Sequence, residues 1–309
     1  MALLVGAILI VVIALAFVAA WFFVQYQRMR REFPRPKAQV VQLRPNLDVW
    51  DDDGIYATWI GHSTVYMRVN GLRVLTDPVF SDQVGVGVGG FLVGPKRYTP
   101  PAITLDDIAA NVDVILLSHA HLDHFDLPSL RKLATRGVHV VTAVGTGRLL
   151  RRLSFAEVVE LGGTDRVELQ NGAVVEAVPV RHWGRRFPWN RRYQWTGYVI
   201  RYQGASVFFA GDTAYADLSG VAQRPVHLAI MPIGAYCPDE FQASHCTPEQ
   251  AWSMFLDTKA EWLLPVHWNT FVLSKEPVAE PLQRLIAAAG EDKDRIVVQE
   301  PGQEVRISL

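Results

Sequence analysis

The sequence is poor in cysteine and in net charge, and each shortage excludes a class of protein. Only two cysteines occur, Cys237 and Cys246, and they form no C-x-x-C pair. This argues against a disulfide-stabilised scaffold and agrees with a reducing compartment. The formal net charge is −1, so no overall basic field favours nucleic acid, and we expect no nucleic-acid partner.

Charged residues are also missing from residues 2–24. A helix of this length extends about 34 Å at roughly 1.5 Å per residue, enough for the ~30 Å apolar core of a bilayer. Arg28, Arg30 and Arg31 follow directly, and positive charge favours the cytoplasmic side. The absence of a preceding basic segment disfavours a cleaved signal peptide. The sequence therefore predicts a single-pass membrane protein with a transmembrane anchor (2–26), a juxtamembrane linker (27–50) and a cytoplasmic body (51–309).

Two segments of the body repeat the same hairpin pattern. Residues 65–75 form two strand-like runs around Asn-Gly, which is a strong hairpin signal. Residues 198–209 form a second pair of runs around Gln-Gly. Asp77 follows the first hairpin and Asp212 follows the second. The repeat predicts an α/β body made of two similar halves.

Strands alternate with helices in the rest of the body. Thr247, Pro248 and Gln250 predict a helix start, with an N-cap, a first-turn proline and a capping-box glutamine. Gly137 and Gly290 are placed to end two other helices, and residues 81–97 are expected to form a loop. The predicted strands are residues 112–117, 138–142 and 262–266, and the other predicted helices are residues 127–135 and 281–289.

Residues 118–126 read SHAHLDHFD and follow one of these apolar strands directly. His119 and His121, two positions apart, can point the same way at a strand end. Asp123 and His124 come from the turn that follows. So many coordinating groups in one turn would repel one another or stay unpaired without a cation. The segment therefore predicts a metal site, although it cannot by itself complete the coordination of two adjacent ions.

Three further candidate ligands each follow an apolar run. His182 comes after residues 174–180, Asp212 after the second hairpin, and His267 after residues 263–266. Each is a residue type that binds metal, and each lies just beyond a predicted strand. We expect all three to converge with residues 118–126 at one edge of the sheets.

The H-A-H-L-D-H segment at residues 119–124 matches the H-x-H-x-D-H signature of the metallo-β-lactamase superfamily, which the chain resembles. Other segments resemble the group of N-acyl-phosphatidylethanolamine-hydrolysing phospholipases D, over residues 55–300. These segments are T-W-I-G-H-S-T-V (58–65), L-T-D-P-V-F (75–80), R-H-W (181–183), F-F-A-G-D-T (208–213), M-P-I-G-A-Y (231–236) and V-H-W-N-T-F (266–271).

The resemblance implies an αββα sandwich, preceded here by the expected transmembrane helix, and a centre with two Zn²⁺ ions. His119, His121 and His182 would hold one ion. Asp123, His124 and His267 would hold the other. Asp212 would bridge the two, since a carboxylate between two cations lowers their repulsion. Without a cysteine ligand, the donors suit zinc but do not exclude iron or manganese.

The resemblance and the local chemistry also suggest roles for other residues. A hydroxide shared by the two metals is the expected nucleophile, with Asp123 orienting the attacking water and His245 contacting substrate or donating a proton. His62 and Asp77 match family motifs and are expected to support the ligands. The arginines and aromatics of residues 181–195 fit a lipid headgroup, an ordinary solvated loop or RNA phosphates. The expected substrate contacts are Trp183, Arg185, Arg186, Tyr236 and Trp268.

The function expected from these patterns is a membrane-anchored phosphodiesterase of phospholipase D type. It would hydrolyse N-acyl-phosphatidylethanolamine to N-acylethanolamine and phosphatidate, with the phospholipid and the bilayer as its partners. Two alternatives stay open: a lactonase or sugar-phosphate hydrolase on the same fold, and a non-catalytic metal-binding membrane scaffold. Acyl-chain preference and oligomeric state, including a dimer, are not set by the sequence.

Overall fold

The computed structural model describes residues 2–187 and 189–309. It divides into two units, Met1–Arg35 and Pro36–Leu309, and helix α1 (Ala2–Arg31) belongs to the first. Among the described residues, no helix is long and apolar enough to cross a membrane. This finding contradicts the expected single-pass anchor and the localisation based on it.

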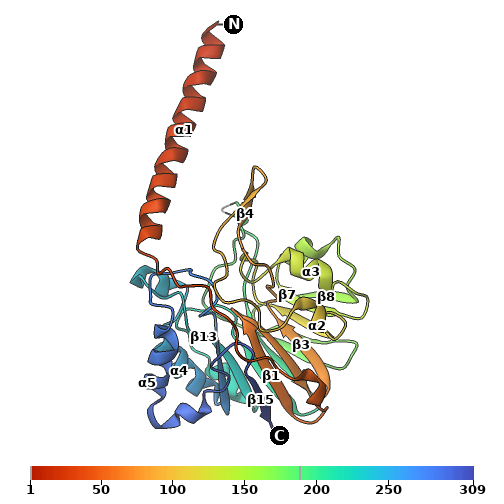
Figure 1. The fold of residues 1–309 in the computed structure, drawn as a ribbon. Helices are drawn as coiled ribbons and strands as arrows, with labels where there is room; N and C mark the ends of the chain where they lie inside the picture. The colour runs from red at the N-terminus through yellow and green to blue at the C-terminus, as the bar shows by residue number, and fades with distance from the viewer. Residues whose placement is uncertain (1, 188) are drawn as a thin grey trace. The chain divides into compact units, whose positions relative to one another are not determined.

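Two β-sheets form the framework of the second unit (Figure 1). In spatial order, the first sheet contains β15 (Glu304–Ile307), β1 (Ile55–Gly61), β2 (Thr64–Val69), β3 (Leu72–Thr76), β6 (Val114–Leu117), β7 (His139–Ala143) and β8 (Glu157–Leu161). The second contains β14 (Trp262–Val266), β13 (Leu228–Pro232), β12 (Ala205–Phe209), β11 (Gly197–Tyr202), β10 (Val174–Val178) and β9 (Arg166–Glu168).

The two sheets repeat one topology, as the paired hairpins predicted. In the first, the antiparallel hairpin β2–β3 is followed by the parallel strands β6 and β7. In the second, the hairpin β11–β12 is followed by the parallel strands β13 and β14. The carboxyl ends of these parallel strands each lie at one edge of their sheet. Residues that follow β6, β12 and β14 are therefore placed to meet.

The core explains why the strand before SHAHLDHFD is apolar at every position. Val114 and Leu116 belong to the cluster that also contains Val207 and Ile230 of the second sheet. Ile115 and Leu117 belong to a second cluster, on the outer face of the first sheet. Successive strand residues point to opposite faces, so a strand covered on both faces needs an uninterrupted apolar run.

Helices cover the outer faces of both sheets, which completes the expected αββα sandwich. Helices α2 (Leu105–Ile108) and α3 (Leu127–Leu133) supply residues to the outer cluster of the first sheet. Helix α4 (Pro248–Thr258) packs against β13 and against α5 (Glu280–Ala289), as Figure 1 shows. Five 3₁₀ segments complete the described part: Leu47–Val49, Gly147–Leu150, Ser219–Gln223, Asp239–Ala243 and Gly290–Arg295.

Local predictions mostly hold at the helix ends. Thr247 caps α4, with the reciprocal hydrogen bonds to Gln250 that define a capping box, and Gly290 ends α5. The prediction for Gly137 is wrong, because α3 already ends at Leu133, where Ala134 adopts an extended conformation. Residues 81–97 contain a short hairpin, β4 (Val86–Val88) and β5 (Phe91–Val93), rather than an irregular loop throughout.

Candidate metal centre

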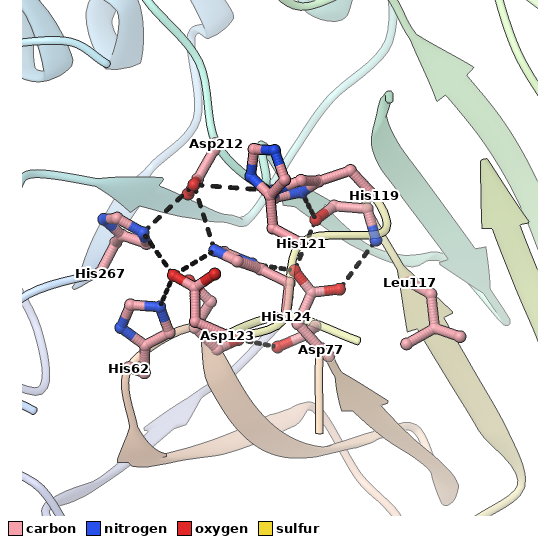
Figure 2. A network of polar contacts seen from close by, with 12 residues as sticks. His62, Asp77, Leu117, His119, His121, Asp123, His124, Asp212 and His267 are labelled. Carbon is pink, nitrogen blue, oxygen red and sulfur yellow. Dashed lines mark hydrogen bonds and ion pairs between the residues drawn. The ribbon is translucent and has the colours of Figure 1, made fainter. Parts of the chain in front are cut away.

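The folding pattern brings the seven predicted ligands together from four strand ends. Figure 2 shows six of them, His119, His121, Asp123, His124, Asp212 and His267, pointing toward one another. The first four follow β6, Asp212 follows β12 and His267 follows β14. His182, which follows β10, joins the same cluster. Their nitrogen and carboxylate atoms form two compact groups, each with its atoms within 4.8 Å of one another.

The first group contains His119, His121, His182 and Asp212. His119 Nε2 lies 2.8 Å from His121 Nδ1, which lies 3.3 Å from His182 Nε2. Two hydrogen bonds fix which nitrogen faces inward. His182 Nδ1 donates to the carbonyl of Ser244 at 2.7 Å, and His119 Nδ1 is 2.8 Å from the hydroxyl of Ser118. The inward nitrogens of His119 and His182 therefore present lone pairs toward His121 Nδ1, an arrangement that a cation between the three rings would satisfy.

The second group contains Asp123, His124 and His267, together with His62. His124 Nε2 and His267 Nε2 lie 3.7 and 3.8 Å from Asp123 Oδ2. Both nitrogens lie 3.1 Å from Asp212 Oδ2. The same oxygen is 3.8 Å from His119 Nε2 and from His182 Nε2 in the first group. One atom of Asp212 is thus shared between the two groups.

Unpaired polar atoms provide an independent test of whether this cluster suits metal ions. Within the described part of the chain, His121 Nε2 and Asp212 Oδ1 are buried without a hydrogen-bond partner. His124 Nε2 and His267 Nε2 also lack one and meet Asp212 Oδ2 only as ion pairs. Buried polar groups normally form hydrogen bonds, because a buried group without a partner costs about 1–3 kcal/mol of stability. All four atoms belong to residues of the two clustered groups. The residues present therefore fit two adjacent cations.

Two supporting residues were predicted, and both contact ligands directly. The buried carboxylate of Asp77 accepts a hydrogen bond from His124 Nδ1 at 2.6 Å. It also accepts from the hydroxyl of Ser118 at 2.5 Å and from its backbone amide at 2.7 Å. His62 Nε2 lies 3.0 Å from Asp123 Oδ2. The contact with Ser118 was not predicted, although this serine opens the SHAHLDHFD segment.

Unusual backbone conformations accompany these contacts. His62, Asp77 and His267 all adopt a positive φ, of 54°, 29° and 64°, a region that costs non-glycine residues free energy and concentrates at functional sites. Gly211 precedes Asp212 with φ of 61°. A Cβ on Gly211 would lie 2.5 Å from the Cβ of Ser118. Glycine is therefore needed for β12 to bring Asp212 alongside the ligand loop.

The three histidines of the first group are uncharged. Burial lowers the pKa of His121 to about 4. Burial, with neighbouring histidines, also holds the pKa values of His119 and His182 well below 6.5. At neutral pH all three rings are uncharged. Neutral imidazole is the form that binds metal.

The second group is charged. Burial favours the neutral forms of His124 and His267, but the carboxylates of Asp212 and Asp123 outweigh it. They raise the pKa of His267 to about 9 and hold the pKa of His124 well above 6.5. Burial likewise opposes ionisation of Asp123 and Asp212, yet the adjacent histidines keep both carboxyl pKa values well below 3.8. Without metal, two protons thus balance the two carboxylates.

His245, predicted as a catalytic residue, lies at the edge of the cluster. Its Nδ1 is 3.9 Å from Asp212 Oδ2, and its ring centroid lies 5.1 Å from that of His182 and 5.3 Å from that of His267. His245 Nδ1 has no hydrogen-bond partner among the residues described. Burial lowers the pKa of His245 to about 4. The ring is therefore neutral at pH 7, in the form that accepts a proton rather than the form that donates one.

The predicted substrate contacts on residues 181–195 separate into two kinds. Trp183 is 46% exposed, and its ring centroid lies 4.2 Å from that of His121, at the open side of the first group. Arg185 is also exposed. Arg186 instead points at the ligand loop, where its Nη1 donates to the carbonyls of Ala120 and Phe125 at 3.1 and 2.8 Å. That nitrogen already has protein partners, which the sequence could not show.

Two other predicted contacts are committed to packing. The hydroxyl of Tyr236 donates to Glu280 at 2.8 Å, and the guanidinium of Arg284 lies over its ring at 4.7 Å. Trp268 is buried and stacks on Trp59 with centroids 5.3 Å apart. Each lies beyond a strand, β13 or β14, but its described contacts are with other side chains of the protein.

Sequence comparison identifies the family. A profile of the beta-lactamase superfamily domain matches residues 72–268. The chain belongs to this superfamily. An uncharacterized protein of Mycobacterium tuberculosis is 34% identical over 288 residues, covering 89% of this chain and 75% of the relative. The mitochondrial N-acyl-phosphatidylethanolamine-hydrolyzing phospholipase D of Saccharomyces cerevisiae is 33% identical over 81% of this chain, which spans only 55% of the yeast protein.

A solved structure shares the fold. A metallo hydrolase from Ignicoccus hospitalis superimposes with a TM-score of 0.61 at 21% identity, covering 82% of this chain and 99% of that one. At this identity the similarity establishes the fold alone. Together with the superfamily match and the ligand clusters, it makes the chain a metal-dependent hydrolase of metallo-β-lactamase fold.

Proposed function

We propose that this hydrolase is a phosphodiesterase with two metal ions, acting on N-acyl-phosphatidylethanolamine in the manner of a phospholipase D. The observation that carries the proposal is the position of Asp212 Oδ2, 3.1 to 3.8 Å from histidine nitrogens of both groups. A shared carboxylate permits two cations to sit close together, and paired cations are suited to phosphoryl transfer.

The donor set favours zinc without fixing the metal. All seven residues offer imidazole nitrogen or carboxylate oxygen, and both cysteines are free thiols outside the donor set. Imidazole suits zinc, iron and copper, while carboxylate also suits manganese. Two zinc ions per chain are our assignment.

The substrate assignment rests on the yeast relative, whose name states this activity, and on the segments shared with that group. The bond that breaks joins phosphorus to the oxygen of the N-acylethanolamine. The oxygen of water forms the new bond to phosphorus, which leaves phosphatidate, and the departing oxygen takes up a proton. When bound, the metals would supply an activated water and neutralise charge on the phosphate.

The chain's own residues hold and move the proton in this scheme. Asp123, fixed by His62 at 3.0 Å, faces the second group and orients the water. His245 is neutral at pH 7 and adjacent to Asp212. We assign it the transfer of a proton from the attacking water to the departing oxygen. Trp183, exposed beside His121, borders the space that the phosphate would enter.

The test is an assay of the purified full chain with N-acyl-phosphatidylethanolamine in mixed micelles, compared with a lactone and a sugar phosphate. We expect phosphodiester hydrolysis that a chelator abolishes and Zn²⁺ restores, and that Asp123→Asn removes. Asp294→Asn changes an exposed aspartate on a 3₁₀ segment and should leave the rate unchanged. Hydrolysis that survives both chelation and Asp123→Asn would overturn the mechanism, and turnover of the lactone alone would overturn the substrate assignment.

A further inference from the structure

The segment between β10 and β11 is fastened beside the ligand loop. Trp195 pairs with His119 in an isolated antiparallel bridge, and its Nε1 donates to the carbonyl of Val180 at 3.0 Å. Gly184 is buried where the chain folds back on itself. A residue with a Cβ would not fit there, because the Cβ would lie 2.6 Å from the carbonyl of Gln194. The arginines that follow Gly184 therefore start from a fixed position next to the metal centre.

Arg186 reaches from this segment to both ends of the loop that carries four ligands. Its Nη1 donates to the carbonyl of Ala120, between His119 and His121, and to the carbonyl of Phe125, directly after His124. Its guanidinium carbon also lies 5.9 Å from the ring centroid of the fully buried Phe125. One charged group thus ties together two backbone points that bracket His121, Asp123 and His124.

The loop's own hydrogen bonds leave these two carbonyls for Arg186. Within the turn, the amides of His124 and Phe125 both bond to the carbonyl of His121, at 3.2 and 2.8 Å. They close the turn but do not connect its first residues to its last. Hydrogen bonds that involve a charged group are roughly twice as strong as neutral ones. Arg186 therefore supplies a second strong link across the loop, beside that of Asp77, which joins Ser118 to His124.

We propose that Arg186 is a positioning residue that holds the H-A-H-L-D-H loop in its metal-binding conformation, rather than a contact for the substrate. It acts on the metal ligands through backbone carbonyls and touches neither the reacting atoms nor a metal. The inference concerns metal affinity, and only its kinetic consequence rests on the proposed phosphodiesterase function.

The experiment compares Zn²⁺ affinity in Arg186→Gln, Arg186→Lys and Arg185→Gln, by competition with a chromophoric chelator in the full-length protein. Arg185 is the matched control, because it is exposed on the same segment and forms no hydrogen bond or ion pair within the described residues. We expect Arg186→Gln to weaken Zn²⁺ binding roughly 10- to 100-fold, the usual effect of removing a group that orients metal ligands. The Zn²⁺ affinity of Arg186→Lys should lie between those of Arg186→Gln and the wild type, and that of Arg185→Gln should equal that of the wild type.

Two further readouts separate positioning from general destabilisation. Added guanidinium ion should recover part of the Zn²⁺ affinity of Arg186→Gln, which a loss of overall stability would not permit. If that variant does not fold, Arg186→Lys carries the same comparison. With saturating Zn²⁺ the remaining loss should lie in kcat, whereas a substrate contact would raise KM. Equal Zn²⁺ affinities for the Arg186 and Arg185 variants would overturn the proposal, even if the wild type hydrolyses the phospholipid. A loss of Zn²⁺ affinity confined to the Arg186 variants would support the proposal, even if the wild type does not hydrolyse the phospholipid.

Discussion

The two groups of the metal centre both hold their ligand atoms within 4.8 Å of one another, but their histidines differ in charge. Burial keeps His119, His121 and His182 neutral, so these rings are already in the form that binds a cation. The second group places His124 and His267 against two carboxylates that keep them protonated. The contrast teaches that burial and nearby acids compete for a buried histidine's charge. His124 and His267, both 3.1 Å from Asp212, hold protons that an incoming metal must displace. His62 lies 3.0 Å from Asp123 but stays neutral, because burial and His267 lower its pKa to about 3.

We expect the largest effect at Asp212, the residue that contacts both groups. Replacing Asp212 with Asn removes the charge shared by both groups, so we expect both ions to bind weakly and hydrolysis to fall about a thousandfold or more, since several kcal/mol of transition-state stabilisation depend on the metals. The measurements are metal content and kcat/KM. Retention of two tightly bound ions in this variant would show that the groups do not depend on a common carboxylate.

The pH dependence of metal affinity should separate the two groups. His267→Ala leaves the first group intact, and His182→Ala leaves the second. Because His121 has a pKa of about 4, affinity in His267→Ala should be flat between pH 7 and pH 8. Affinity in His182→Ala should rise about tenfold per pH unit for each proton displaced, until the pH passes the pKa of His267, about 9. Titration calorimetry in buffers of different ionisation enthalpy counts the protons, and equal slopes for the two variants would contradict the assignment.

The sign of the effect on folding is also fixed by these pKa values. His267 has a raised folded-state pKa, so its contribution to the stability of the metal-free protein is complete below its ordinary value of 6.5. That contribution is lost as pH rises through about 9. We expect the unfolding midpoint of metal-free protein to fall over this range, and to fall less in His267→Ala. A midpoint independent of pH from 6.5 to 9 would contradict the charged second group.

Asp77 and Ser118 sharpen the comparison. Asp77 bonds to His124 of the second group, whereas Ser118, which also donates to Asp77, lies beside His119 of the first. Asp77→Asn removes the carboxylate that holds His124 Nδ1 and should weaken the second ion by roughly 10- to 100-fold. Ser118→Ala removes the hydroxyl beside His119 Nδ1 and its hydrogen bond to Asp77. It should weaken the first ion by a smaller factor than Asp77→Asn weakens the second, since the backbone amide of Ser118 still holds Asp77. Equal loss at both ions in either variant, in stepwise Zn²⁺ titrations, would argue against separate supports.

The smallest expected effect lies outside both groups, at the start of α4. Thr247→Ala removes the cap that follows His245 and should cost about 1 kcal/mol of unfolding free energy. Metal affinity should not change, because Thr247 lies outside the clustered ligand groups. Denaturant unfolding and the same Zn²⁺ titration check the two halves of this prediction, and reduced affinity would couple the helix to the metal centre.

The sequence predicts the fold and which residues follow each strand. The αββα fold followed from the repeated hairpins and the resemblance. The convergence of His182, Asp212 and His267 followed from their places after β10, β12 and β14. Side-chain direction was beyond it: Arg186 turns to the carbonyls of Ala120 and Phe125, and nothing in the arginine-rich segment distinguishes it from Arg185.

Local composition was not sufficient at three other places. Tyr236 follows β13, yet its hydroxyl finds Glu280, which lies 44 residues later. Gly137 suits a helix end, but α3 ends earlier at Leu133. The uncharged stretch 2–24 met the compositional requirement for a membrane span, whereas the described residues contain no helix that meets the structural one. The contact between Tyr236 and Glu280 is of a kind that short sequence patterns do not encode.

Anomalous diffraction from crystals of the metal-loaded protein, recorded at the absorption edge of the bound metal, tests the central claim most directly. The account predicts two peaks about 3.5–4 Å apart, one bounded by His119, His121 and His182, the other by Asp123, His124 and His267, with Asp212 between them. A single peak, or two peaks that do not share Asp212, would contradict it.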